Sequence, residues 1–323
     1  MAVLELEDVS VTYTSGAGDI PAVRAVSLAV DSGRSLGLAG ESGSGKTTVT
    51  STVLRLLPKS AAVTGRVLLD GEDVLTMRWG RLRAVRWATA SVVFQGAMHA
   101  LNPVQRIGHQ IAEPIRLHEK AVSEPTARAR VGDLLEQVGL PSRVAQSYPH
   151  QLSGGQKQRV MIAMALACGP RLIVADEPTT ALDVMVQQQV LAVLAERVRD
   201  LGLAMVFISH DLSVLASACD DLAVMYAGQV VEQGPSDRVF EQAHHPYSRA
   251  LGDAYPRIGD RRFRYAPSGL PGDPPFPGEA PAGCAFHPRR PDARDVCATT
   301  DVELRPSGDR RWSSCLFAPE VGT

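Results

Sequence analysis

The sequence of 323 residues contains no long hydrophobic run. A helix that crosses a bilayer needs roughly 20 predominantly apolar residues, and the best candidate, 160–170, is about half that length before charged residues follow. The first ten residues include three carboxylates and lack the basic and apolar regions of a signal peptide. We therefore expect a chain that is made and stays in the cytoplasm.

The chain also has no large excess of positive or negative charge. Its number of cysteines is odd, so they cannot all pair within the chain. Lys and Arg number 33 against 35 Asp and Glu, so the net charge is -2 and there is no basic footprint for nucleic acid. Five cysteines in a protein that is expected to stay in the cytoplasm do not suggest a disulfide framework. Hydrophobic residues make up 45% and charged residues 21%, which is typical of a globular protein.

Up to about residue 235 the chain alternates between short apolar, β-rich runs and stretches with helical periodicity. This alternation predicts an α/β fold around a largely parallel sheet. The clearest predicted strands are 35–39, 90–94, 172–175 and 205–208, and the clearest predicted helices are 47–57 and 184–201.

Two regions depart from this alternation. The interval 96–158 has a helical tendency with breaks at Pro103, Pro125, Pro141 and Pro149, which predicts several short helices inserted between two strands of the sheet. Beyond Pro246, proline and glycine crowd together in 267–283, which predicts an extended, loop-rich appendage without long helices.

The first motif with chemical content runs from Gly40 to Thr47 and fits the phosphate-binding pattern G-x-x-x-x-G-K-[ST]. It follows a predicted strand and opens a predicted helix, where backbone N–H groups and the helix N-terminus attract phosphate. Lys46 can reach the β- and γ-phosphates, and the Thr47 hydroxyl can bind Mg²⁺. The residues predicted to bind nucleotide here are Gly40, Ser42, Gly43, Ser44, Gly45, Lys46, Thr47 and Thr48.

The second motif is a pair of adjacent carboxylates, Asp176 and Glu177, at the end of the apolar run 172–175. Successive side chains of a strand point to opposite faces, so the two groups can have different functions. We expect Asp176 to hold Mg²⁺ and Glu177 to polarise the attacking water.

The third motif is Leu-Ser-Gly-Gly-Gln at 152–156. Ser153 is a plausible helix N-cap, and Gly154 and Gly155 expose backbone N–H groups that could bind a second set of phosphates. A capped helix after a loop explains Ser153 but does not require two successive glycines. Gln156 completes the run.

This run resembles the signature motif of ABC-type ATPases, and the order of motifs in the whole chain is similar to that family. The resemblance implies that Tyr13 stacks on adenine, that the loop residue Gln95 contacts Mg²⁺ and relays to a membrane partner, and that Asp183 lies at a dimer interface. It also implies that His210 is the switch histidine at the γ-phosphate. Lys46, Gln95, Glu177 and His210 are thus the expected catalytic residues.

The resemblance implies a P-loop NTPase core with an N-terminal antiparallel β subdomain, an inserted α-helical subdomain and a Pro/Gly-rich C-terminal extension. We place the cassette at 1–240, its helical subdomain at about 97–160, and the extension at 241–323. In this family two cassettes enclose two ATP molecules with Mg²⁺, and each site combines one subunit's phosphate loop with its partner's signature. The intact motifs predict an active ATPase.

The sequence from His245 to Leu251, and Pro-rich and Cys-containing segments after it, are similar to the extension of oligopeptide/dipeptide/nickel-type importer ATPases. Four cysteines of that extension can hold an iron–sulfur cluster in the family. Here Cys284, Cys297 and Cys315 match three positions, and Arg290 occupies the remaining one. Three reduced cysteines without metal and a three-cysteine cluster both stay open.

The favoured function is the ATPase of an importer for di- or oligopeptides or a related solute, on the cytoplasmic side of the cell membrane. The implied partners are a sister cassette or a second copy, two membrane permeases and an extracytoplasmic binding protein, with no nucleic acid. Nickel, glutathione and oligosaccharides remain open as cargo. The alternative is a soluble ABC ATPase that acts on ribosomes or DNA.

Overall fold

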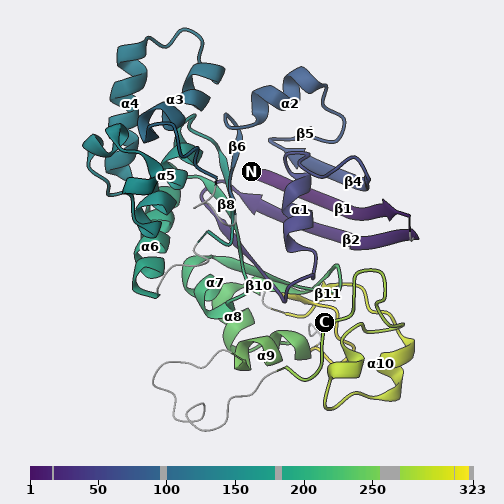
Figure 1. Ribbon diagram of the computed structural model, residues 1–323. Helices are drawn as coiled ribbons and strands as arrows, with labels where there is room; N and C mark the ends of the chain where they lie inside the picture. Colours follow the sequence, from purple (N-terminus) through teal and green to yellow (C-terminus); the bar gives the residue numbers. More distant parts are fainter. Residues whose placement is uncertain (17, 95–99, 179–183, 255–269, 309, 320–323) are drawn as a thin grey trace. The chain divides into compact units, whose positions relative to one another are not determined.

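A computed structural model describes the protein (Figure 1) over residues 1–16, 18–94, 100–178, 184–254, 270–308 and 310–319. By contacts the chain divides into two compact units. The first comprises 1–4, 30–34 and 69–206, and the second comprises 5–29, 35–68 and 207–323. The division into 1–240 and 241–323 follows the order of the sequence rather than contacts, and it stays a prediction.

Two long strands, β1 (Ala2–Ser15) and β2 (Gly18–Asp31), run antiparallel, and β4 (Ala61–Leu69) lies on the other side of β1. The short β5 (Glu72–Asp73) completes this sheet. Exposed and buried residues alternate over 25–31 of β2, as expected for a strand with one face on the core. The expected N-terminal antiparallel β subdomain is confirmed.

The second unit also contains the strands that carry the phosphate-binding segment. Strand β3 (Ser35–Ala39) pairs in parallel with β9 (Asp221–Tyr226), and β10 (Gln229–Pro235) pairs antiparallel with β9. Strand β8 (Ala204–Ser209), of which 207–209 belong to this unit, is the other neighbour of β3. Every residue of β3 and β8 is buried. Strands that are covered on both faces have mostly apolar sequences without alternation, as these two have.

Helix α1 (Lys46–Thr52) is shorter than the predicted 47–57. Its sequence is rich in β-branched residues, which lose side-chain freedom in a helix. Arg55 then adopts a left-handed φ of 49°, which ends the helical turn before Pro58. The other helices of this unit are α7 (Leu212–Ala218), α8 (Ser236–Glu241), α9 (Pro246–Asp253) and α10 (Asp295–Thr299), with a 3₁₀ turn at His287–Arg289.

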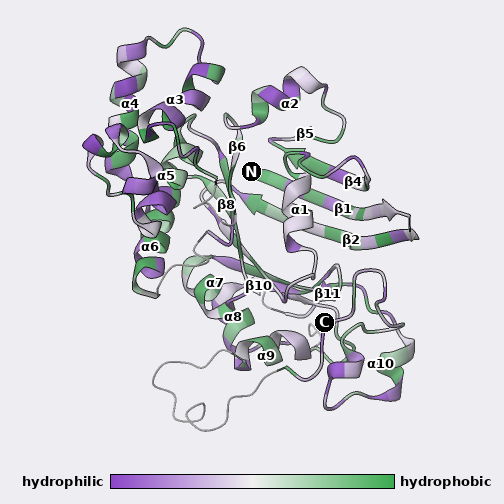
Figure 2. Ribbon diagram, viewed as in Figure 1, coloured by the Kyte–Doolittle hydropathy of each residue, from purple (hydrophilic) through white to green (hydrophobic). Residues whose placement is uncertain are grey.

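In the first unit, β6 (Ala90–Val93) pairs in parallel with β7 (Leu172–Asp176). The predicted short helices do lie between these strands. They are α3 (Ile107–His118), α4 (Glu124–Gln137), α5 (Gly154–Leu166) and two 3₁₀ turns at Ser142–Gln146 and Pro149–Gln151. Helix α3 packs on α4 and α5, and hydrophilic residues gather along α3 and α4 in Figure 2.

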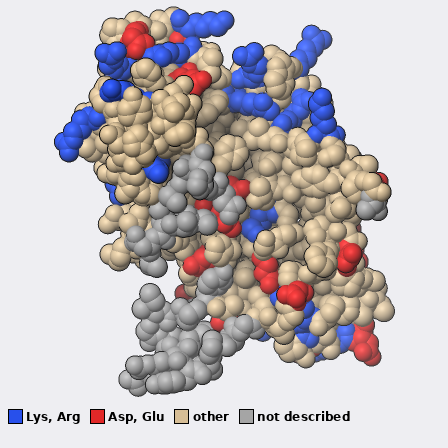
Figure 3. All heavy atoms as spheres, in the orientation of Figure 1, with Lys and Arg blue, Asp and Glu red and all other residues tan. Residues whose placement is uncertain are grey.

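Helix α6 (Val184–Leu201) has the predicted bounds and packs on α5. The remaining helix of the first unit, α2 (Trp79–Val85), is short and follows Arg78. Lys and Arg atoms gather around this helix in Figure 3, and the segment contributes Arg78, Arg81, Arg83 and Arg86. The nearly neutral chain therefore contains a local basic patch.

Across the described residues, no helix is both long and apolar enough to span a membrane.

The C-terminal region is loop-rich, as predicted, but it also contributes strands. Strand β12 (Trp312–Ser313) pairs antiparallel with β10 and with β11 (Arg305–Pro306). Glu232 lies opposite Ser313 and Gln233 opposite Trp312. The sequence did not predict this pairing, because strands of two residues have no periodicity to detect.

Candidate nucleotide-binding site

The loop between β3 and α1 has backbone geometry that only glycine accepts at two positions. Gly40 has φ 148°, and a Cβ there would lie 2.3 Å from the Met225 carbonyl oxygen. Gly45 has φ 102°, and a Cβ there would lie 2.8 Å from the Ala22 carbonyl oxygen. The loop therefore lies so close to the neighbouring backbone that a side chain at either position would clash.

Lys46 is the first residue of α1, and it is only 7% exposed because its side chain turns back to the loop. Its Nζ donates to the carbonyl oxygens of Gly40 at 2.7 Å and Glu41 at 2.8 Å, and to Ser44 Oγ at 3.3 Å. Thr47 follows at the first turn of α1 and is exposed. This donor set suits a triphosphate with Mg²⁺, because a lysine ammonium and a threonine hydroxyl bind phosphate oxygens and the metal, respectively.

Tyr13, near the end of β1, lies beside the same helix. Its hydroxyl is 3.4 Å from Thr48 Oγ1, with both groups partly buried. Tyr13 is half-buried, so part of its ring surface remains accessible. This contact brings the residue expected to stack on adenine to the helix that begins at the phosphate loop.

His210 is exposed and directly follows the last residue of β8. The next residue, Asp211, is the N-cap of α7, and its carboxylate accepts hydrogen bonds from the backbone N–H groups of Ser213 at 2.9 Å and Val214 at 3.3 Å. His210 therefore lies in a short bend held between a buried strand and a capped helix.

In the first unit, the buried strand β7 ends at Asp176, which is 6% exposed. Glu177 follows with φ 43°, a conformation that non-glycine residues seldom adopt. Such strained residues cluster at functional sites, where surrounding structure holds them. The two adjacent carboxylates thus have different backbone conformations and different burial.

The signature segment begins helix α5 through a capping box. Ser153 Oγ accepts from the Gln156 N–H at 3.3 Å, and Gln156 Oε1 accepts from the Ser153 N–H at 2.9 Å. A Cβ on Gly155 would lie 2.4 Å from Val186 Cγ1 of α6. Gly155 therefore has a packing function that the sequence interpretation did not include.

The expected site residues fall into two groups by unit. The phosphate loop, Tyr13 and His210 belong to the second unit, whereas Asp176, Glu177 and the signature belong to the first. Gln95 and Asp183 lie outside the described residues.

Sequence interpretation missed two residues that contact the phosphate loop. Arg289 forms an ion pair with Glu41 at 2.7 Å, and the Tyr247 hydroxyl accepts from the Glu41 N–H at 2.9 Å. Tyr247 and Arg289 both lie in segments singled out as extension-like, but no local pattern reveals a contact across more than 200 residues.

The C-terminal cysteines are close in space but do not suit an iron–sulfur cluster. The Cys284 N–H donates to the Cys297 carbonyl oxygen at 2.8 Å, and Arg290 Nη1 lies 3.8 Å from Cys315 Sγ. Burial raises the pKa of the Cys284 thiol. Within the described ranges no group of three or more His, Cys, Asp or Glu side chains could hold a metal. The possible cluster therefore finds no support here.

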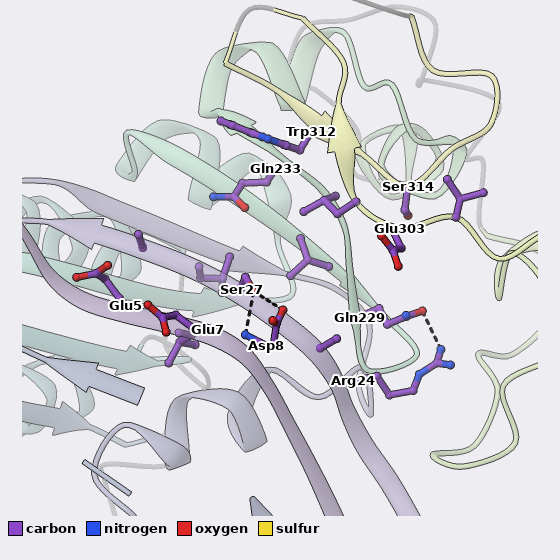
Figure 4. Close-up of a pocket in the computed structure, with 17 residues that line it drawn as sticks. Glu5, Glu7, Asp8, Arg24, Ser27, Gln229, Gln233, Glu303, Trp312 and Ser314 are labelled. Atoms are coloured by element: carbon purple, nitrogen blue, oxygen red, sulfur yellow. Dashed lines mark hydrogen bonds between the residues drawn. The ribbon is translucent and has the colours of Figure 1, made fainter. Parts of the chain in front are cut away.

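A cavity of about 700 Å³ lies elsewhere in the second unit, between β1, β2 and the C-terminal strand region (Figure 4). Acidic residues line it, including Glu7, Asp8 and Glu303, and Arg24 at its margin donates to Gln229 Oε1 at 2.9 Å. None of its lining residues belongs to the predicted ATP site. Its presence does not change the location of that site.

Two family models match the chain: ABC transporter over residues 23–180, and oligopeptide/dipeptide transporter, C-terminal region, over 231–297. The chain is 42% identical to a probable D,D-dipeptide transport ATP-binding protein of Escherichia coli over 98% of this chain and 97% of the relative. It is 40% identical to the oligopeptide transport ATP-binding protein of Salmonella typhimurium, over 91% and 88% of the two chains.

Solved structures agree with these matches. The dimeric structure of a bacterial ABC transporter cassette has a TM-score of 0.65 and 30% identity, over 72% of this chain and 98% of that one. A post-hydrolysis state of the same cassette, bound to ADP and phosphate, has a TM-score of 0.65 and 29% identity over the same shares. The chain therefore belongs to the ATP-binding proteins of ABC transporters that carry the oligopeptide/dipeptide transporter C-terminal region, and it is an ATPase.

Proposed function

We propose that this ATPase drives the uptake of di- or oligopeptides, or of a chemically related solute, through separate membrane permeases. The observation that carries the proposal is the co-occurrence of the phosphate loop at 40–47 with the family's C-terminal region at 231–297 in one chain. Relatives that share both regions along nearly their whole length are described as dipeptide and oligopeptide transport ATP-binding proteins. The alternative of a ribosome- or DNA-directed ATPase has no comparable support.

In the proposed site, the backbone of Gly40 to Thr48, with Ser42, Gly43, Ser44 and Gly45, surrounds the phosphates. Lys46 exchanges its carbonyl partners for β- and γ-phosphate oxygens, and Tyr13 stacks on adenine. Thr47, Asp176 and Gln95 would hold Mg²⁺, which supplies charge neutralisation at the phosphates. The buried Lys46 ammonium, which donates to two carbonyl oxygens of the loop, supports this assignment.

Glu177 would orient the attacking water, and His210 would stabilise charge at the γ-phosphate together with Lys46. Phosphoryl transfer of this kind depends on positioning and electrostatics more than on covalent chemistry. The left-handed backbone of Glu177 supports its role, because such strain is held where a side chain must point in one direction.

A second cassette would complete each site. Ser153, Gly154, Gly155 and Gln156 would contact nucleotide held by the partner, with Asp183 at the interface. We favour a sister ATPase over a second copy. Two permeases and an extracytoplasmic binding protein would complete the importer, and the chain would lie on the cytoplasmic side of the inner membrane. The cassette would cover 1–240, with the helical subdomain at about 97–160, and the extension 241–323.

Affinity purification of this chain from its native membranes in mild detergent, followed by mass spectrometry, tests the proposal. We expect two multi-span permeases, a sister cassette and a secreted binding protein, whose ligand can then be identified by screening. Ribosomal proteins or nucleic acid without a permease would contradict transport while leaving the ATPase assignment intact.

A further inference from the structure

Glu41, the second residue of the phosphate loop, is held by residues more than 200 positions away. Arg289 Nη1 donates to Glu41 Oε2 at 2.7 Å and Nη2 donates to Oε1 at 2.9 Å, which makes a bidentate pair. The Glu41 N–H donates to the Tyr247 hydroxyl at 2.9 Å. The carboxylate and the backbone of one loop residue are thus both fixed by the C-terminal region.

Arg289 is itself held on every side. It is 6% exposed, its Nε donates to the Pro271 carbonyl oxygen at 2.8 Å, and Nη1 donates to the Tyr226 hydroxyl at 3.3 Å. Its guanidinium also lies 5.8 Å from the Tyr226 ring centroid and 5.9 Å from the Phe286 centroid. Glu41 and Tyr226 further raise the pKa of Arg289, so the cation is permanent.

The aromatic support for this pair comes from three separate segments. Tyr226 ends β9, Tyr247 lies in α9, and Phe286 precedes the 3₁₀ turn that contains Arg289. Their ring centroids are 4.6 to 5.5 Å apart in a mutually packed cluster. Tyr247 and Phe286 are buried almost completely. Arg289 therefore has little freedom to leave Glu41.

The same glutamate also contacts the catalytic lysine. The Glu41 carbonyl oxygen accepts from Lys46 Nζ at 2.8 Å and from the Ser44 N–H at 3.3 Å. A chain of contacts therefore runs from Arg289 through Glu41 to Lys46. An unpaired Glu41 carboxylate would oppose the positive potential that the loop offers to a triphosphate.

We propose that Arg289 is a positioning residue for ATP: it neutralises Glu41 and fixes the phosphate loop, so the C-terminal region sets the affinity of the cassette for nucleotide. This inference rests on the proposed role of the loop in phosphate binding. It predicts an effect on ATP affinity and on the KM for ATP, with little change in kcat at saturating ATP, because Arg289 contacts the loop rather than the reacting atoms.

The test compares MgATP binding by the full-length variants Arg289→Met, Arg289→Lys and Glu41→Gln/Arg289→Met, with ATPase assays in the assembled complex. We expect Arg289→Met to weaken binding roughly tenfold, because it leaves a carboxylate unpaired beside the loop. The double variant should recover most of the affinity, and Arg289→Lys should lie between the wild type and Arg289→Met. Wild-type affinity in both Arg289 variants, or no recovery in the double variant, would overturn the proposal.

Two controls separate this effect from other causes. The double variant Glu232→Gln/Arg311→Met removes a different buried ion pair of the C-terminal region, at 2.6 Å, and should lower the melting temperature without weakening ATP binding by the folded protein. Lys46→Ala should lose ATP binding. If Lys46→Ala binds normally, the proposed site itself is wrong; if only the Arg289 variants bind normally, the site stands and this inference fails.

Discussion

Arg311 Nη2 donates to Glu232 Oε1 at 2.6 Å in an ion pair that is almost wholly excluded from solvent, with side-chain exposures of 3% and 0%. Glu232 belongs to β10, and its carboxylate also accepts from the backbone N–H groups of His244 at 2.8 Å and His245 at 2.9 Å. One carboxylate therefore joins a sheet strand, the turn before α9 and the segment before β12.

Removing one member of this pair should destabilise the chain strongly. Arg311→Met leaves a buried carboxylate with only backbone donors, and breaking a buried pair in this way costs about 3–5 kcal/mol. Urea or thermal unfolding of the full-length protein measures this loss. The double variant Glu232→Gln/Arg311→Met should lose less than the sum of the two single variants, and additive losses would show that the groups do not depend on each other.

Gly155 provides a test of packing that is separate from nucleotide binding. An added Cβ would lie 2.4 Å from Val186 Cγ1, so Gly155→Ala should cost about 1–3 kcal/mol in unfolding free energy. Val186→Ala in the same chain should restore part of the loss. Gly132→Ala in α4 is the control, because its Cβ would meet only Ser142 at 3.5 Å and alanine favours helix. Equal stability of Gly155→Ala and Gly132→Ala would contradict the contact.

Glu177 should affect hydrolysis without affecting ATP binding. Glu177→Gln keeps the shape of the side chain but removes its charge and basicity, so ATP turnover should fall by about two to three orders of magnitude. Radiolabelled phosphate release in the assembled complex measures turnover, and equilibrium binding of MgATP provides the comparison. Retention of most of the activity would show that another group orients the water.

The parts of this fold that could be predicted are those with a local signal. Strand β3 and helix α6 have the predicted bounds, because one is a fully buried apolar run and the other is an 18-residue amphipathic stretch. Helix α1 was predicted too long, since apolar spacing continued past the point where Arg55 becomes left-handed.

The ATP-site motifs were recognisable because their chemistry requires particular residues at fixed spacings, as in Gly40 to Thr47. The contacts around Glu41 were not recognisable. Arg289 is 248 residues away, and only the fold places its guanidinium beside the loop. The packing function of Gly155 was missed for the same reason, because it depends on the approach of α6.

The burial of His245 leads to a prediction of how the free energy of unfolding changes between neutral and mildly acidic pH. Its side chain is buried, and burial, followed by the charge of Arg290, lowers its pKa from 6.5 to about 3. The Tyr247 N–H donates to His245 Nδ1 at 3.1 Å, which fixes the neutral ring with its proton on Nε2. Between about pH 6.5 and 3, the unfolded chain therefore binds a proton that the folded chain does not.

The contribution of neutral His245 to the free energy of unfolding is complete above about pH 6.5, and it is lost as the pH falls toward 3. From pH 7 to pH 5 this group alone should reduce the free energy of unfolding by about 2 kcal/mol. His245→Asn keeps an acceptor for the Tyr247 N–H but cannot titrate, so its stability should be lower at pH 7 and change less between the two values. Chemical denaturation at pH 7 and 5 measures both, with the exposed His150→Gln as the matched control. An equal pH dependence in wild type and His245→Asn would show that His245 is not the group that loses its proton on folding.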